Sequence, residues 1–210
     1  MTGSSLQLFI HTGMIADNHI DFLVDNAGYS IVGAAEEFKD EDILHQIDTN
    51  LISSIRTIRA FLPYFRHQGG GRIVQVSSEG GQVTYPGFSV YHASKWGIEG
   101  FIESVAQEVA PFNISFAIAE PGPTSTQFAA NAKTASLMQE YAETPADVVR
   151  EKIKNADFDE LDTPEYVAQR IIEMVNSEDL PNRFAIGKVA YHNLEQTLEN
   201  RLNTVKQLGY

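Results

Sequence analysis

The sequence predicts an α/β fold built on a parallel β-sheet. Short apolar runs alternate along the chain with longer segments of helical period, a pattern typical of βαβ units. The chain has 210 residues and a hydrophobic fraction of 43%, enough for one domain with a substantial core. No internal repeat or low-complexity tract interrupts this alternation.

The first half of the chain contains a strand, a long helix and a second strand. Residues 20–24 are predicted as a buried strand that ends at Asn26-Ala27-Gly28, and residues 72–77 as the second strand. Residues 41–67 are predicted as a helix, which Pro63 should end or kink before Gly69-Gly70-Gly71 breaks the chain. Its apolar positions recur every three or four residues and form one stripe, made up of Leu44, Ile47, Leu51, Ile55, Ile58, Leu62 and Phe65.

The second half repeats this alternation. A helix is predicted from Tyr91 to about residue 110, followed by strands at 114–119 and 183–187 and a terminal helix at 189–208. Thr144-Pro145 and Thr163-Pro164 each place a hydroxyl cap before a proline at the first helical position. Residues 124–144 have no clear period and are long for a loop, which favours a functional lid.

Composition narrows the classes of function. The formal net charge of −13 repels phosphate backbones and anionic lipid, which argues against nucleic acid and membrane as partners. The absence of cysteine excludes disulfides and thiolate metal sites, and the six histidines show no metal-ligand spacing. No apolar run reaches the length of about 18 residues that a membrane span needs. The N-terminus does not resemble a secretory signal, so a cytoplasmic location is expected.

Tyr91 and Lys95 are the first candidates for chemistry. They stand four residues apart on a predicted helix, so their side chains share one face. An ammonium group beside a phenol should lower the tyrosine pKa toward neutrality, where the phenol can exchange a proton with an alcohol or carbonyl oxygen. The accompanying hydride transfer needs a nicotinamide, since no side chain performs it. Taken alone, however, Tyr-x-x-x-Lys is more often a solvated helix pair.

Neighbouring motifs favour the chemical interpretation. Ser78 comes just after a predicted strand, where its hydroxyl could hold the reacting oxygen. Asn26-Ala27-Gly28 ends an earlier strand and Pro121-Gly122 a later one. In a parallel sheet these strand ends lie along one edge, which is where ligands of open α/β folds bind.

From about residue 20 to Tyr210 the chain resembles the short-chain dehydrogenase/reductases, which have a Rossmann-like, doubly wound parallel sheet. Five motifs carry the resemblance in the family's order and spacing: Asn26-Ala27-Gly28, Asn50 within Asp48-Thr49-Asn50-Leu51, Val76-Ser77-Ser78, Tyr91-His92-Ala93-Ser94-Lys95 and Pro121-Gly122-Pro123-Thr124-Ser125-Thr126. The resemblance implies an NAD- or NADP-dependent oxidoreductase that interconverts a small-molecule alcohol and a ketone or aldehyde.

The resemblance also implies a role for each matching residue. Tyr91 would be the general acid/base, and Ser78 would polarise the substrate carbonyl. Lys95 would lower the tyrosine pKa and hydrogen-bond the nicotinamide ribose, while Asn50 would hold a water that relays protons to Lys95. Thr124 and Thr126 would touch the nicotinamide carboxamide or the phosphates. The full set of cofactor-binding residues would be Asn26, Ala27, Gly28, Tyr91, Lys95, Pro121, Gly122, Thr124 and Thr126.

Simpler interpretations of several residues stay open. Asn50 is also explained as an ordinary polar residue in mid-helix, and Ser77 is the immediate rival of Ser78. Glu79 is expected to be a solvated loop carboxylate. Five residues either line an apolar substrate pocket or lie buried beneath the lid: Tyr85, Phe88, Phe128, Met138 and Tyr141.

One family feature is missing from this sequence. The motif Thr-Gly-x-x-x-Gly-x-Gly, which brings a helix N-terminus to the cofactor pyrophosphate, has only partial echoes at Thr2-Gly3 and Thr12-Gly13. We therefore expect an incomplete sheet without the first βαβαβ cofactor half, weakened dinucleotide binding, and an open apolar edge at residues 20–24. Residues 6–10 are predicted as an antiparallel strand that turns near Asp17-Asn18, because a parallel crossover needs more residues.

These features predict a single partial domain over residues 1–210. It comprises an atypical N-terminus (1–19), a core with the catalytic motifs (20–123), a substrate lid (124–162), and C-terminal helices with the last strand (163–210). The resemblance implies a homo-oligomer, because the helices at 41–67 and 91–110 correspond to the family's interface. The alternative to a working oxidoreductase is a non-catalytic remnant or an interaction protein that keeps the catalytic face.

Overall fold

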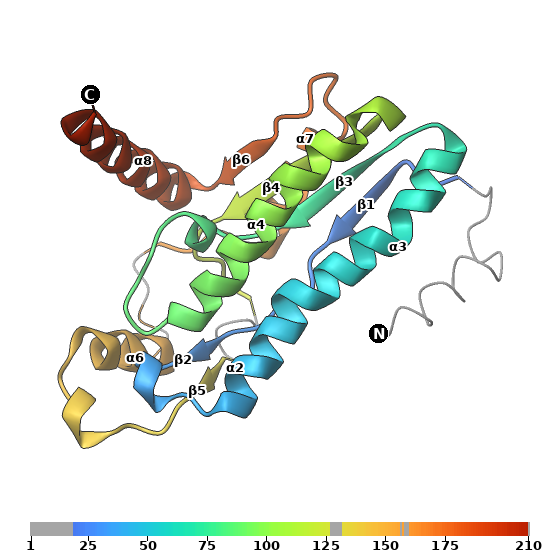
Figure 1. The fold of residues 1–210 in the computed structure, drawn as a ribbon. Helices are drawn as coiled ribbons and strands as arrows, with labels where there is room; N and C mark the ends of the chain where they lie inside the picture. Colours follow the sequence, from blue (N-terminus) through green and yellow to red (C-terminus); the bar gives the residue numbers. More distant parts are fainter. Residues whose placement is uncertain (1–18, 127–131, 156, 158–159, 210) are drawn as a thin grey trace.

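A four-stranded parallel sheet lies at the centre of the molecule (Figure 1). The computed structural model describes residues 19–126, 132–155, 157 and 160–209. Within these residues the strand order is β1 (Phe22–Asp25), β3 (Gly71–Val76), β4 (Ile114–Pro121) and β6 (Arg183–Ile186). Val24 lies opposite Val74, which in turn lies opposite Ala117. The predicted α/β fold with a parallel sheet is confirmed.

Helices cover both faces of this sheet, and the strand period of two decides which side chains meet which helix. Ile73, Phe116 and Ile118 point to one face, where they pack against α3 (Ser53–Gln68) and α4 (Ser89–Val109). Val74 and Ala117 point to the other face, against α7 (Pro164–Val175). The central strands β3 and β4 are therefore buried on both sides, as their nearly continuous apolar sequences indicate.

The long helix predicted at 41–67 is present, with two differences. It runs through α2 (Asp40–Ile47), a π-helical turn η2 (Asp48–Ile52) and α3. Of the two alternatives predicted for Pro63, the end of the helix is excluded, because α3 continues until Gly69 takes a left-handed φ of 95°. The buried Phe61 and Phe65 flank Pro63 and anchor this part of α3 in the core, which offsets the hydrogen bond that a proline removes.

A small second layer of structure lies beyond the main sheet. It contains β2 (Ile31–Val32), which pairs in parallel with β5 (Lys133–Thr134), the short 3₁₀ helix η1 (Ala35–Glu37), and α6 (Pro145–Asn155). β5 and α6 belong to the region predicted as a lid. Arg150 of α6 forms a buried ion pair with Glu37 of η1, which ties the predicted lid to the 20–123 segment; its bond to Asp147, at 3.0 Å, lies within α6.

The two expected Thr-Pro helix starts behave differently. Thr163 caps α7 as predicted, because its hydroxyl accepts the backbone N–H of Tyr166. Thr144 precedes α6, but its hydroxyl donates to the Tyr141 carbonyl at 2.7 Å and so does not cap the helix. The terminal helix α8 (Lys188–Leu208) extends from the end of β6 (Figure 1).

β1 forms one edge of the described sheet. Phe22 and Val24 on this strand are 43% and 39% exposed, in agreement with the expected open apolar edge. The predicted strand at 6–10 lies outside the described residues.

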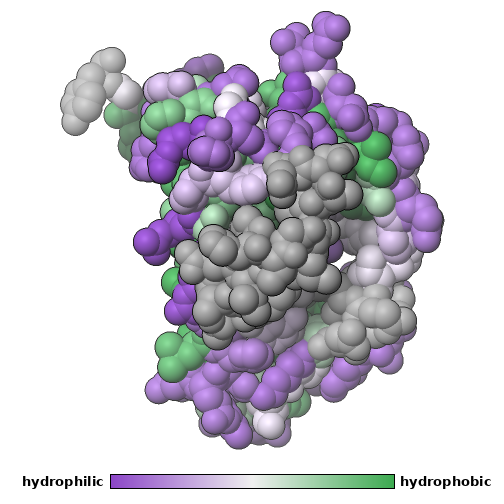
Figure 2. Space-filling model, turned by 90° about the vertical axis from the view of Figure 1, so that its right-hand side faces the viewer, coloured by the Kyte–Doolittle hydropathy of each residue, from purple (hydrophilic) through white to green (hydrophobic). Residues whose placement is uncertain are grey.

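Figure 2 shows one face of the molecule, where hydrophilic side chains predominate in the described part and apolar ones form small separate groups. Within the described ranges, no helix combines the length and the apolar character that a membrane crossing requires.

Candidate functional site

The candidate site lies where three neighbouring parallel strands end. β1 leads into Asn26-Ala27-Gly28, β3 into Ser77 and Ser78, and β4 into Gly122. Ser78 begins the short 3₁₀ helix η3 (Glu79–Gly81), and its hydroxyl accepts the backbone N–H of Gly80 at 3.0 Å. The strand order therefore brings these motifs to one edge of the sheet.

Tyr91 and Lys95 reach this edge from the first turns of α4. Lys95 is only 5% exposed, and its ammonium donates to the carbonyl of Val76 at 3.0 Å. The same nitrogen lies 5.8 Å from the centre of the Tyr91 ring. Tyr91 in turn hydrogen-bonds Ser78. The structure thus places Ser78, Tyr91 and Lys95 next to one another at the end of β3.

The protonation of this cluster differs from the expectation. Burial raises the pKa of Tyr91 to about 12; the bond with Ser78 lowers it, and the charges of Glu79 and Glu99 raise it further. Burial also lowers the pKa of Lys95 to about 8, although Glu99 and Asp25 favour its charged form. The prediction that Lys95 brings the tyrosine pKa toward neutrality was therefore wrong, because burial and two carboxylates determine the outcome.

Asn50 lies in the π-helical turn η2 and is 1% exposed. Its amide nitrogen donates to the Tyr29 carbonyl at 2.9 Å and to the Ser94 hydroxyl at 3.1 Å, while its oxygen accepts the N–H of Tyr29 at 3.0 Å. These bonds hold the segment after β1 against α4. A methyl group placed on Gly28 would lie 3.5 Å from the Asn50 oxygen and 3.8 Å from the Lys95 nitrogen, so the three residues converge.

The two neighbouring serines have different hydrogen-bond partners. The Ser77 hydroxyl is 2.5 Å from the Glu99 carboxylate and is buried, whereas that of Ser78 faces Tyr91. Glu79 is buried rather than solvated, which corrects the expectation. Its carboxylate accepts a hydrogen bond from Asn193 of α8 at 2.9 Å, and burial raises its pKa. A helix more than a hundred residues away in the chain therefore closes over this turn.

Sequence reasoning missed a group of buried charges behind the cluster. Glu99 and Glu120 are each 2% exposed, and both accept hydrogen bonds from Arg183 of β6, at 2.5 and 2.9 Å. Asp25, at the end of β1, is buried as well, and burial raises its pKa. For Glu99 a signal was present, because it stands four residues after Lys95 on the same helix face.

The residues expected near the nicotinamide follow β4. Thr124 donates to the carbonyl of Gly122 at 3.0 Å and pairs with Asp162, and the N–H of Thr126 bonds the Thr124 carbonyl at 2.8 Å. These residues and Asn26-Ala27-Gly28 lie at the ends of β4 and β1, on either side of β3. They are half-buried or exposed, and so are accessible to a ligand at this edge.

The aromatic residues proposed for a substrate pocket do not form one cluster. Tyr85 and Phe88 do lie together, because their rings are 5.9 and 6.1 Å from that of His92, and the ring of Phe88 is 6.0 Å from that of Tyr91. Tyr141 instead donates to Glu36 at 2.9 Å, and Phe128 lies outside the described residues.

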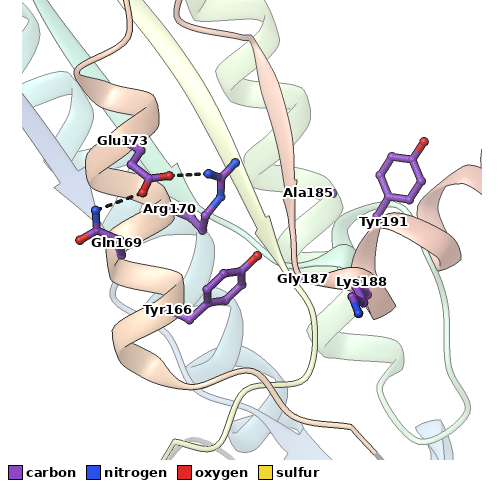
Figure 3. Close-up of a pocket in the computed structure, with 8 residues that line it drawn as sticks. All are labelled: Tyr166, Gln169, Arg170, Glu173, Ala185, Gly187, Lys188 and Tyr191. Atoms are coloured by element: carbon purple, nitrogen blue, oxygen red, sulfur yellow. Dashed lines mark hydrogen bonds and ion pairs between the residues drawn. The ribbon is translucent and has the colours of Figure 1, made fainter.

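A separate open cavity of about 510 Å³ lies between α7 and the start of α8 (Figure 3). None of the four candidate catalytic residues lines it.

Several known proteins are similar to this chain in sequence or fold. The model of the short chain dehydrogenase family matches residues 8–137. The chain is 32% identical over 168 residues to oxidoreductase BOA17 of Botryotinia fuckeliana. The matched part is 80% of this chain and 61% of that protein. A short-chain dehydrogenase from Streptomyces avermitilis superposes with a TM-score of 0.86 at 30% identity, covering 98% of this chain and 74% of the other. An alcohol dehydrogenase from the archaeon Thermococcus sibiricus, complexed with 5-hydroxy-NADP, shares the fold with a TM-score of 0.68 at 20% identity, covering 88% and 70%.

The matched segment contains the whole site around α4. Asn50, Ser78, Tyr91 and Lys95 all lie within residues 8–137. The chain spans about three fifths of the length of the curated relative described above. The family match covers well over half of the chain, and the chain therefore belongs to the short-chain dehydrogenase/reductase family.

Proposed function

We propose that this chain carries the proton-transfer site of an NAD(P)-dependent oxidoreductase that interconverts an alcohol and a ketone or aldehyde. The observation that supports this most directly is the contact of Tyr91 with Ser78 beside the buried ammonium of Lys95, at the carboxyl edge of the sheet. A half-buried phenol next to a hydroxyl and an ammonium group is suited to binding and protonating one oxygen atom.

Tyr91 is the proposed proton donor. With a pKa raised to about 12, its phenol keeps its proton throughout the neutral range, which is the form needed to protonate a carbonyl oxygen during reduction. Ser78 is placed to orient the same oxygen through its hydroxyl. Asn50, in this proposal, supports the site by holding Tyr29 and Ser94 in place and by positioning a water near Lys95.

A nicotinamide cofactor would supply or accept the hydride when bound. The proposed binding residues are those at the ends of β1 and β4, together with Tyr91 and Lys95: Asn26, Ala27, Gly28, Pro121, Gly122, Thr124 and Thr126. The structural neighbour solved with an NADP derivative supports a dinucleotide of this class. Because the 210-residue sequence has no glycine-rich pyrophosphate motif, we propose that this chain binds the dinucleotide weakly.

Residues 124–162 are the proposed substrate lid. Their connections to the core run through β5, which pairs with β2, and through the Arg150–Glu37 ion pair. We also propose that the chain is a homo-oligomer, since α4 exposes Trp96 and α2 exposes Leu44, while β1 leaves an apolar edge.

A titration of the purified chain with NADH and with NADPH tests the proposal. Nicotinamide fluorescence should show saturable binding of at least one of them, followed by turnover with ketones or aldehydes. Tyr91→Phe should remove turnover while leaving the dissociation constant nearly unchanged, because it deletes only the proton donor. Tyr191→Phe is the matched control, since Tyr191 is 62% exposed and outside the site, and it should keep both properties.

The non-catalytic alternative makes the opposite prediction. If neither dinucleotide binds saturably at millimolar concentration, this chain does not act as an oxidoreductase. An equal loss of affinity and turnover in Tyr91→Phe would contradict the role of Tyr91 as proton donor.

A further inference from the structure

Glu99 connects four elements around the site. It lies on α4 one turn after Lys95 and two turns after Tyr91, so all three share a helix face. One of its carboxylate oxygens accepts the hydroxyl of Ser77 at 2.5 Å, and the other accepts Arg183 at 2.5 Å. The end of β3, helix α4 and strand β6 therefore meet at this carboxylate.

The fourth element is the turn η3, which Ser78 caps. A methyl group added to Gly81 would lie 1.6 Å from a carboxylate oxygen of Glu99, far inside any allowed contact. The backbone of this turn thus leaves the space that the Glu99 carboxylate fills. Ser77 and Gly81 lie on either side of Ser78, so Glu99 contacts the chain both before and after it.

We propose that Glu99 is a positioning residue of this site, whose carboxylate fixes the turn that bears Ser78 and serves as a counter-ion of Lys95 from one helical turn further along α4. The importance of Glu99 for catalysis rests on the proposed function. Its contacts with the turn and its effect on the charge of Lys95 do not depend on that proposal. Glu99 touches no reacting atom and acts through Ser77, Gly81 and Lys95.

The surrounding charges support the counter-ion role. Lys95 faces Glu99 on its own helix and Asp25 from β1, and of the two Glu99 favours the charged lysine more strongly. Glu99 itself faces Arg183 from β6 and Glu120 from β4. Arg183 neutralises part of this negative charge, which allows two buried carboxylates to lie close together.

The first test measures the ionisation of Lys95 directly. In protein with labelled lysine side chains, NMR follows the Lys95 signal against pH, and Lys95→Arg identifies it. We expect the Lys95 pKa, about 8 in the original chain, to fall by about 1 in Glu99→Gln, since a nearby opposite charge typically shifts a pKa by about 1–3.

Glu103→Gln is the matched control. Glu103 is on the same helix and also bonds Arg183, at 2.7 Å, but its side chain is half-exposed and lies about two turns beyond Lys95. Its substitution should leave the Lys95 pKa unchanged. An unchanged pKa in Glu99→Gln, or an equal fall in both variants, would overturn the counter-ion role.

The second test examines the space beside Gly81 and does not depend on Glu99→Gln being folded. Gly81→Ala should shift the urea midpoint of unfolding downward in the original chain, because the methyl group displaces the carboxylate. The shift should be much smaller in a Glu99→Ala background, where that carboxylate is absent. Equal shifts in both backgrounds would refute the contact.

Neither measurement requires turnover. If the chain binds no dinucleotide but Lys95 responds to Glu99 as expected, the proposed function fails while the positioning role stands. If dinucleotide binding and turnover are found but Lys95 does not respond, only the role of Glu99 fails.

Discussion

The ion pair between Glu37 and Arg150 makes a quantitative prediction about the proposed lid. Both side chains are fully buried, with 0% and 1% of their surface exposed. Glu37 also accepts two backbone N–H groups, from Ala34 at 2.7 Å and from Met138 at 2.9 Å, one on each oxygen. In Glu37→Gln the amide nitrogen must replace one of these oxygens, so the substitution removes the negative charge and leaves one backbone donor without its acceptor.

The expected cost follows from these contacts. Removing one partner of a buried ion pair destabilises a protein by about 3–5 kcal/mol, because the remaining charge is buried and uncompensated. Here Asp147 still bonds Arg150 at 3.0 Å, which places the ion-pair loss near the lower end. We therefore expect the free energy of unfolding to fall by about 3 kcal/mol, a large part of the roughly 5–15 kcal/mol typical of a folded protein.

Urea unfolding followed by circular dichroism measures this change. Glu173→Gln is the control, because it breaks the Arg170–Glu173 pair of α7, whose side chains are about two-fifths exposed; it should cost less than about 1 kcal/mol. If Glu37→Gln costs no more than Glu173→Gln, then the buried pair does not hold the 124–162 region to the core.

Three further predictions concern pH and association. Because Tyr91 keeps its proton up to a pKa of about 12, carbonyl reduction should exceed alcohol oxidation near pH 7, and the initial rate of oxidation should rise with pH; oxidation that is fastest below pH 7 would contradict this. Burial raises the pKa of Glu120 from 4.5 to about 7, so the folded chain holds a proton that the unfolded chain loses across this window. The original chain should then lose stability relative to Glu120→Gln as the pH rises from 4.5 to 7, and a constant difference in urea unfolding would argue against a raised pKa. Sedimentation should show a dimer or larger species, and replacing Phe22 with Lys at the exposed edge should reduce non-specific aggregation; a stable monomer would refute the proposed oligomer.

The sequence by itself determined the local structure and the family. Short apolar runs and the three-to-four-residue stripe predicted the strands β1, β3, β4 and β6 and the long helix before β3, because such periods reflect which face of an element is buried. The spacing of Tyr91 and Lys95 placed both on one face of α4, since four residues make about one helical turn. The match to family motifs located the site, and the roles of its residues stay predictions.

Only the tertiary structure decided the environment of those residues. The order β1-β3-β4-β6 placed Asp25 near Lys95, and Arg183 reached Glu99 from a strand 84 positions away in the chain. Such non-local contacts determine that the hydroxyl of Ser77 donates to Glu99 and that Glu79 is buried. They also explain the raised pKa of Tyr91, because the ionisation of a group depends on its burial and on the charges around it. The periodicity of apolar residues along the chain carries no information about the burial of a single polar group or about the charges that surround it.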